Sequence, residues 1–119
     1  TSIYLQYSRA RIMSILQGES ITCNKDEFAK LDSVYEWDIV QKLLKFNSVL
    51  KVVENTYNFS VLCNYLYELC KMFSRWYNEC SIKNAEPNIK NARLYLAKAI
   101  AETIKNGLYI LGIEAPDRI

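Results

Sequence analysis

The sequence predicts an all-α fold, a bundle of about five helices that forms a single domain over residues 1–119. Helix-breaking residues are scarce, because the 119 residues include only three Gly and two Pro. The strongest helical signal lies in residues 60–80, where apolar side chains recur at alternating spacings of four and three: Leu62, Leu66, Leu69, Phe73, Trp76 and Cys80. Further apolar residues widen this stripe over most of the helix surface, so we expect several neighbouring helices to cover it.

The first helix is predicted over residues 2–17, and Gly18 should end it. Its core-facing stripe has the helical period and comprises Leu5, Ser8, Ile12, Ile15 and Leu16. A second stripe carries Tyr4, Tyr7 and Arg11, whose spacings of three and four make them neighbours on the helix surface. Two interpretations are open. These side chains can stack on a base and pair with a phosphate, or the tyrosines can pad the core while Arg11 extends to water.

Residues 18–32 are polar and acidic, and they predict a connecting loop with at most a short helical turn near its end. Ser33 followed by Glu36 is a capping-box pattern that should open the next helix. Asn47 or Ser48 is then expected to cap a shorter helix, whose inward side chains are predicted to be Val49, Leu50, Val52 and Val53. Both helices are interpreted as packing scaffold.

After the long helix, residues 81–87 are predicted to form a loop, and Pro87 should lie near the first turn of the last helix. The apolar face of this helix comprises Leu94, Ala97, Ala101, Ile104, Leu108 and Leu111. Gly107 interrupts the face, so that it either relieves a tight contact with a neighbouring helix or permits a bend. Gly112 is expected to cap the helix, with Pro116 beyond it and a tail that ends in an apolar residue.

Composition argues against a membrane or metal-binding protein. No stretch approaches about 18 uncharged apolar residues, so no membrane span is expected, and no signal peptide is recognisable. The chain has no histidine and no Cys-x-x-Cys pair, which disfavours a zinc site; its four cysteines are Cys23, Cys63, Cys70 and Cys80. We therefore expect buried thiols and a cytoplasmic protein. Because the chain begins with Thr1 and not with Met, we expect it to belong to a longer chain.

The net charge is only +2, but its distribution along the chain is uneven. Residues 1–17 hold two arginines and no acid, and residues 81–108 hold five Lys and Arg against two acids. Between them, residues 18–38 hold six acids against two lysines. The two basic segments could form one positive face for an anionic partner, or the charges could be an ordinary solvated mixture.

The chain lacks the residues of a catalytic centre. It has no histidine, no Gly-rich phosphate loop, no nucleophile elbow and no metal-ligand cluster. The sequence is therefore interpreted as a binding or structural module, with no catalytic residue assigned.

Three segments in the same order resemble the C-terminal domain of arginyl-tRNA synthetases. Residues 5–12, LQYSRARI, resemble the Gln-Tyr-x-His-x-Arg element that opens this domain, with Arg9 where the family often has His. Residues 64–69, NYLYEL, are similar to its central helix, and residues 105–119, KNGLYILGIEAPDRI, are similar to its closing segment, where Met is the common last residue. The resemblance covers nearly the whole chain and implies a helical anticodon-binding domain of the DALR type found in class I synthetases.

The resemblance assigns tRNA anticodon binding to four residues. Tyr7 and Arg11 match the Tyr and Arg of the opening element, which are expected to bind the anticodon loop by stacking and by charge-assisted hydrogen bonds. Tyr77 matches an aromatic residue that lines the pocket for an anticodon base. Ile119 matches the C-terminal residue, whose main chain and carboxylate fold into the same site. A core role is predicted for Trp76, and solvated surface positions are predicted for Arg75, Lys105 and Arg118.

The function implied is recognition of the anticodon stem-loop of arginine tRNA, in support of ATP-dependent arginylation. No cofactor is expected in this chain, since ATP and magnesium would bind in a catalytic core that it lacks. That core would be a partner within the same chain, and a monomer is expected. The alternative is a helical protein-interaction module without RNA binding, whose partner groove would be formed by Tyr4, Tyr7, Trp76 and Tyr77. RNA binding would weaken steeply with salt, whereas binding of an apolar peptide would not.

Overall fold

The computed structural model describes residues 2–119 and has the all-α fold that the sequence predicts. Thr1, the first residue of the predicted domain, lies outside the described residues. Five helices of eleven or more residues form the bundle, and the four-residue helix α2 lies in the acidic connector. Their bounds are α1 Ser2–Leu16, α2 Lys25–Phe28, α3 Val34–Leu44, α4 Phe46–Thr56, α5 Ser60–Glu79 and α6 Pro87–Ile110.

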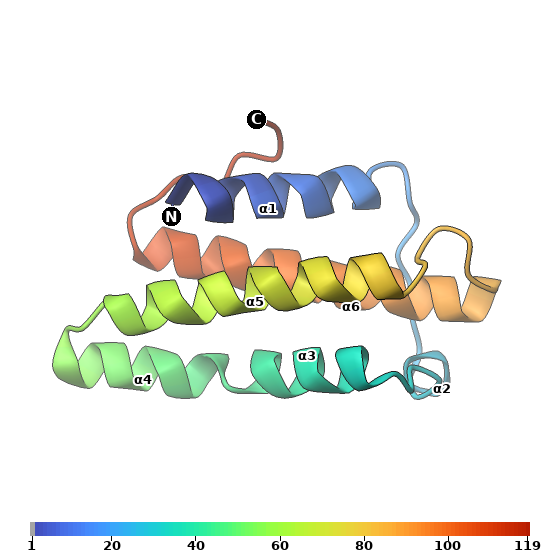
Figure 1. Cartoon of the computed structure of the whole chain (residues 1–119), viewed down its shortest axis with the longest axis horizontal. Helices are drawn as coiled ribbons and strands as arrows, with labels where there is room; N and C mark the ends of the chain where they lie inside the picture. The colour runs from blue at the N-terminus through green and yellow to red at the C-terminus, as the bar shows by residue number, and fades with distance from the viewer. Residues whose placement is uncertain (1) are drawn as a thin grey trace.

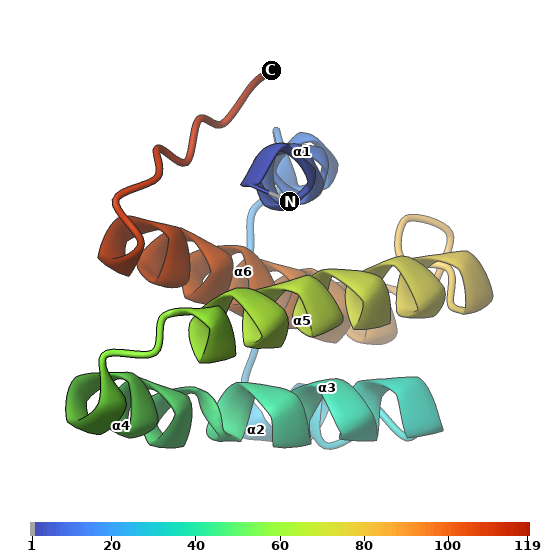
Figure 2. The same ribbon diagram turned by 60° about the vertical axis from the view of Figure 1, so that its left-hand side comes forward.

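The longer helices are arranged in three layers (Figures 1 and 2). Helices α5 and α6 form the middle layer, α1 covers one side of it, and the consecutive helices α3 and α4 cover the other. Helix α5 contacts α1, α3, α4 and α6, as its largely apolar circumference predicts. The C-terminal tail leaves α6 and crosses to the outer side of α1, so both ends of the sequence meet at one face of the bundle.

The predicted apolar stripe of α5 forms the centre of the core. Five of its six residues are at most 1 % exposed, and Cys80 lies half-buried at the end of the helix. Gly107 of α6 packs against this stripe, because a Cβ atom placed there would lie only 2.7 Å from both methyl carbons of Leu66. Of the two roles predicted for Gly107, the structure therefore supports relief of a tight helix contact.

Glycines end α1 and α6 as predicted. Gly18 has a φ of 76° two residues after the end of α1, and Gly112 has a φ of 73° two residues after the end of α6. At Gly112 the chain forms a Schellman motif, in which Ile113 N–H donates to the Leu108 carbonyl at 2.8 Å and Gly112 N–H donates to the Tyr109 carbonyl at 3.0 Å. This turn redirects the chain toward α1 and so sets the course of the tail.

The prediction for α4 is wrong in two respects. The helix begins at Phe46 without a side-chain cap, because Lys45 both ends α3 and precedes α4, so neither Asn47 nor Ser48 caps it. Val52 is exposed and not inward, whereas Val53 is buried. Helices α3 and α4 form an outer layer that contacts α5 through one narrow face, and for the same reason α3 exposes Val34, Trp37 and Leu44.

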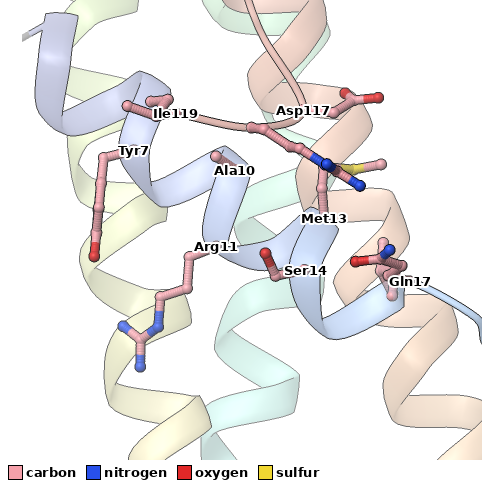
Figure 3. A pocket seen from close by; sticks show the side chains of 10 residues that line it. Tyr7, Ala10, Arg11, Met13, Ser14, Gln17, Asp117 and Ile119 are labelled. Carbon is pink, nitrogen blue, oxygen red and sulfur yellow. The ribbon is translucent and has the colours of Figure 1, made fainter.

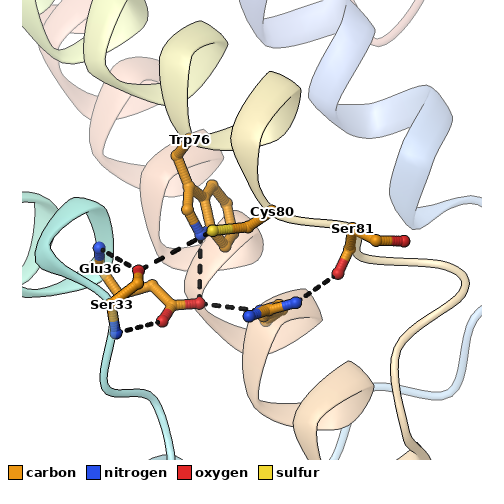
Figure 4. A network of polar contacts seen from close by, with 6 residues as sticks. Ser33, Glu36, Trp76, Cys80 and Ser81 are labelled. Atoms are coloured by element: carbon orange, nitrogen blue, oxygen red, sulfur yellow. Dashed lines mark hydrogen bonds and ion pairs between the residues drawn. The ribbon is translucent and has the colours of Figure 1, made fainter.

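A buried polar network joins α3 to the two helices of the middle layer, α5 and α6, near the C-terminal end of α5 (Figure 4). The Glu36 carboxylate of α3 accepts hydrogen bonds from Arg93 Nε of α6 at 2.8 Å and from Trp76 Nε1 of α5 at 3.2 Å. Its other oxygen accepts from Ser33 N–H at 3.2 Å, which completes the predicted capping box, and Arg93 also donates to the Ser81 carbonyl. Burial alone would raise the pKa of Glu36, but the hydrogen bonds from Arg93, Ser33 and Trp76 outweigh it and lower the pKa from 4.5.

The four cysteines are free thiols, but the prediction that they are buried is right only for Cys70, because Cys23, Cys63 and Cys80 are partly exposed. Burial raises the pKa of Cys70 to about 11. No helix within residues 2–119 combines the length and the hydropathy needed to cross a bilayer. Across the same residues, no group of three or more His, Cys, Asp or Glu side chains is placed to hold a metal ion.

Candidate nucleic-acid interface

A cavity of about 640 Å³ lies between α1 and the C-terminal tail, within the usual size range of ligand sites (Figure 3). Three of the four residues predicted to bind tRNA, Tyr7, Arg11 and Ile119, lie in its wall. The other lining residues are Ala10, Met13, Ser14, Leu16 and Gln17 from α1 and its end, with Asp117 and Arg118 from the tail. The structure therefore brings together side chains from opposite ends of the sequence.

Helix α1 presents one polar and aromatic face to the cavity. The Tyr7 side chain is 61 % exposed, and Arg11 is also exposed, so the interpretation in which Tyr7 pads the core is wrong. Ser14 and Gln17 continue the same face at spacings of three, and sequence reasoning missed them. The helical period that selected Tyr7 and Arg11 would have found both, had it been extended by two further turns.

Tyr77, the fourth predicted residue, adjoins the cavity through Arg11. The Arg11 guanidinium carbon lies 4.9 Å from the centroid of the Tyr77 ring, in cation–π geometry. The Tyr77 ring in turn stacks on the buried ring of Phe73, with centroids 5.7 Å apart and an angle of 20° between the planes. Among residues 2–119, Arg11 has no carboxylate within ion-pair distance. Its face is therefore supported by the core, while its N–H edges remain open to an acceptor.

The tail is held on α1 by polar side chains of that helix. Gln6 Nε2 donates to the Glu114 carbonyl at 2.9 Å. Arg9 Nη1 donates to the Ala115 carbonyl and to Asp117 Oδ1, both at 2.9 Å. Although arginine is normally exposed, Arg9 is only 4 % exposed and lies between α1, α6 and the tail. Arg9, which stands where the family often has His, thus helps to bind the tail.

Arg118 has a second property, besides its exposure, that the sequence prediction did not include. It was predicted to be solvated surface, and it is exposed, but it also lies in the cavity wall next to Ile119. Arg75 and Lys105 are exposed away from this cavity, and Trp76 is fully buried, as predicted. Arg118 directly precedes Ile119, which the resemblance had assigned to the site, and this position is the signal that would have identified Arg118.

The basic segments do not form one continuous positive face, and the structure favours the ordinary distribution of charge. Lys83 and Lys90 of the second basic segment pair with Glu19 at 2.8 and 3.5 Å, because the acidic connector folds back along α6. The hydrogen bond from Lys83 is the main cause of a lowered pKa of Glu19. Arg93 pairs with Glu36, and Arg9 pairs with Asp117. Most Lys and Arg side chains of the two basic segments are therefore paired with carboxylates within the fold.

The groove of the alternative interpretation does not form. Trp76 is 0 % exposed, with its Nε1 bonded to Glu36, so its side chain cannot contact a partner. Tyr4 packs against Tyr67 of α5, with ring centroids 5.2 Å apart. Tyr4 and Tyr7 are both exposed on α1, but without Trp76 the four side chains do not form one groove, and Tyr7 and Tyr77 both lie near Arg11.

This arrangement defines an all-α binding domain, with aromatic faces and a C-terminal tail around an open cavity, whose wall holds two arginines, Arg11 and Arg118, that have no carboxylate partner among residues 2–119. Two solved structures have the same fold over 98 % of the chain. It is 27 % identical to Thermus thermophilus arginyl-tRNA synthetase, with a TM-score of 0.86. It is also 27 % identical to the Plasmodium falciparum arginyl-tRNA synthetase, with a TM-score of 0.85, and it covers 21 % of each of those chains.

The chain belongs to the DALR anticodon binding domain family, which it matches over residues 5–119. Over 121 residues it is 37 % identical to the arginine–tRNA ligase of Prochlorococcus marinus strain MIT 9312 and 42 % identical to that of Actinobacillus succinogenes. Each match includes the whole of this chain but only 20 or 21 % of the relative. The chain therefore spans about a fifth of the length of these relatives, and the predicted resemblance to the C-terminal domain of arginyl-tRNA synthetase is confirmed.

Proposed function

We propose that this domain binds the anticodon loop of arginine tRNA in the cavity between α1 and the tail. The observation that carries the proposal is the position of Arg11, stacked on Tyr77 while it shares a cavity wall with Tyr7 and Ile119. Single-stranded loops expose both base faces and base edges, so they are bound by aromatic rings together with fixed polar groups. This cavity offers both kinds of group side by side.

Each of the four residues has a distinct role in this proposal. The exposed Tyr7 ring stacks on an anticodon base, an interaction worth about 1–3 kcal/mol per base. Arg11, whose guanidinium lies over the Tyr77 ring, donates from its N–H edges to a phosphate or a base carbonyl. The carboxylate of Ile119 accepts hydrogen bonds from amino groups on a base edge, which contributes to base identity.

The domain is proposed to act within a longer arginine–tRNA ligase, since its relatives are about five times its length. The catalytic core of such an enzyme would use ATP and magnesium to attach arginine to the tRNA. Anticodon contacts assist that chemistry by holding the tRNA in register, so that its acceptor end reaches the core. A monomeric, cytoplasmic enzyme is proposed, and the four free thiols agree with a reducing compartment.

The proposal is tested by measuring the Kd of the full-length protein for a fluorescently labelled arginine tRNA transcript. Tyr7→Ala and Arg11→Ala should each weaken binding about tenfold, the loss expected for one stacked base or one charge-assisted contact. Tyr95→Ala and Lys98→Ala are the matched controls, because both residues are exposed on α6 outside this cavity. If Tyr7→Ala and Arg11→Ala bind like the unaltered protein, the site is wrong.

A salt titration separates RNA recognition from a protein-interaction module. RNA binding releases counterions from each contacted phosphate, so the affinity should fall linearly on a log–log plot with a slope of about −0.7 per contact. Arg11→Ala should make this slope shallower, and Tyr7→Ala should leave it unchanged because a stacked ring displaces no counterion. A flat salt dependence in the unaltered protein would favour the protein-interaction module.

A further inference from the structure

We infer that Arg9 is a positioning residue that fixes the C-terminal tail as a preformed wall of the cavity before any RNA binds. The inference rests on the proposed function, because it assigns to Arg9 the placement of the Ile119 carboxylate used in that site. Arg9 itself is not among the residues that line the cavity and would not touch RNA. It acts through the tail that it binds.

The contacts of Arg9 join three parts of the fold. Its Nε donates to the Ala101 carbonyl of α6 at 3.3 Å. Its Nη1 donates to the Ala115 carbonyl and to Asp117 Oδ1 at 2.9 Å, and the Pro116 carbonyl lies at 3.5 Å. Three consecutive tail residues thus converge on one guanidinium nitrogen, which is held in place by the backbone of α6.

The tail depends on such contacts because it has no regular secondary structure. Residues 113–119 follow the Schellman turn without a helix or strand, so their order must come from side chains of neighbouring elements. Besides the contacts of Arg9, the tail accepts one hydrogen bond from Gln6, at the Glu114 carbonyl. The carboxylate of Asp117 is 68 % exposed, so its ion pair with Arg9 is partly screened, and the backbone carbonyls are the more important acceptors.

The bundle has other means of packing α1 on α6, so the contacts of Arg9 with the tail are not needed for the fold alone. Leu5 and Ile12 of α1 and Ile104 of α6 are at most 1 % exposed within the same core cluster. An apolar residue at position 9 would therefore keep the helices together. A guanidinium suits the observed position because its planar fork donates in several fixed directions, which the ammonium group of lysine does not.

The first arm of the test measures the tail without RNA. ¹⁵N relaxation of the tail amides should give order parameters near 0.85 in the unaltered full-length protein and below about 0.6 in Arg9→Met. Circular dichroism checks that Arg9→Met is still helical at the temperature used. Arg9→Lys, which keeps the charge but not the fork, should give intermediate values. A tail that is equally rigid in the unaltered protein and in Arg9→Met, or already mobile in the unaltered protein, overturns the inference.

The second arm is a double-mutant cycle of tRNA affinity in the full-length protein. Arg9→Met should weaken binding of an arginine tRNA transcript about tenfold, and deletion of residues 114–119 should weaken it at least as much. Applied to the tail-deleted protein, Arg9→Met should have no further effect, because Arg9 acts only through the tail. An equal loss in both backgrounds overturns the inference, and so does no loss in the intact protein. Lys98→Met, which removes an exposed positive charge outside the cavity, is the control for net charge.

Failure of the proposed function would look different from failure of this inference. If RNA binding is not the function, the unaltered protein does not bind the transcript, although its tail is rigid in the first arm. That result removes the site that Arg9 was inferred to shape, and it overturns the inference together with the proposed function. If instead the unaltered protein binds and only the cycle fails, the proposed function stands and Arg9 is a purely structural residue.

Discussion

Trp76 and Tyr77 are neighbours on α5, yet their side chains belong to two regions with opposite characters. Trp76 points into the buried network and donates to Glu36, which also accepts from Arg93 (Figure 4). Tyr77 points to the other side of α5 and supports Arg11 beside the open cavity. Each region thus contains one aromatic residue of α5 and one arginine from another helix.

The two regions differ in whether the polar groups have partners inside the fold. In the network, the guanidinium of Arg93 meets a carboxylate and a backbone carbonyl, and the carboxylate is itself fully bonded. At the cavity, Arg11 meets only the face of a ring, and its N–H edges face solvent. Satisfied polar groups hold the α3 layer on the middle layer of α5 and α6, whereas groups left open are available to a ligand. Residue type alone does not distinguish these roles.

The largest expected effect is the loss of Trp76. Trp76→Ala should lower the free energy of unfolding by about 3–5 kcal/mol, because it leaves a cavity in the core and removes a donor from the buried Glu36. Urea denaturation measures it, with Tyr77→Ala as the control at the adjacent, half-buried position. A cost below about 1 kcal/mol for Trp76→Ala would show that the network region is not the stabilising one.

Glu36→Gln breaks the charge of the network while keeping the shape of the side chain. We expect it to lower the free energy of unfolding by about 2–3 kcal/mol, since Arg93 loses its carboxylate partner in a buried position. The comparison is Glu68→Gln, which removes the exposed ion pair with Lys42 and should cost less than about 1 kcal/mol. Similar costs for the two variants would contradict the distinction between buried and exposed pairs.

Acid should weaken the network before it affects the packing of the core. The pKa of Glu36 is lower in the folded protein than its ordinary value of 4.5, so the unfolded chain binds the proton more tightly. The stabilisation from Glu36 is therefore present above pH 4.5 and is lost as the pH falls through the lower, folded pKa. Denaturation curves between pH 7 and pH 3 should show this loss, and Glu36→Gln should flatten the profile in that window.

The smallest effect on stability, and a clear effect on binding, is expected at Tyr77. Tyr77→Leu should change the free energy of unfolding by less than about 1 kcal/mol but weaken tRNA binding about tenfold, because Arg11 loses the ring that supports it. Tyr77→Phe keeps the ring and should bind almost like the unaltered protein. If Tyr77→Phe is as weak as Tyr77→Leu, then the hydroxyl group and not the ring face is what the site uses.

The helices themselves were predictable because their signals are local. The period of α5, the capping box at Ser33 and the glycines after α1 and α6 all depend on residues within a few turns of one another. The prediction was wrong for Val52 of α4, because an apolar period identifies a helix but not how many neighbours will cover it. An outer layer leaves residues such as Trp37 and Val52 exposed.

The candidate site was predictable only in part. The resemblance selected Tyr7, Arg11, Tyr77 and Ile119, and the structure places them around one cavity or next to it. It did not select Arg118, and it identified Arg9 only as a position where the family often has His. Their positions depend on where the tail runs after Gly112, and no local pattern near α1 specifies that course.

The sequence by itself determined the fold class, the family, the start of α3 and the ends of α1 and α6, since each depends on short-range periodicity or on contiguous motifs. Only the tertiary structure decided which charged side chains form ion pairs within the fold and which remain without a partner. The pairs Arg9–Asp117 and Glu36–Arg93 join residues 108 and 57 positions apart. Electrostatic partnership depends on distance in space, and for such residues the folding of the whole chain sets that distance.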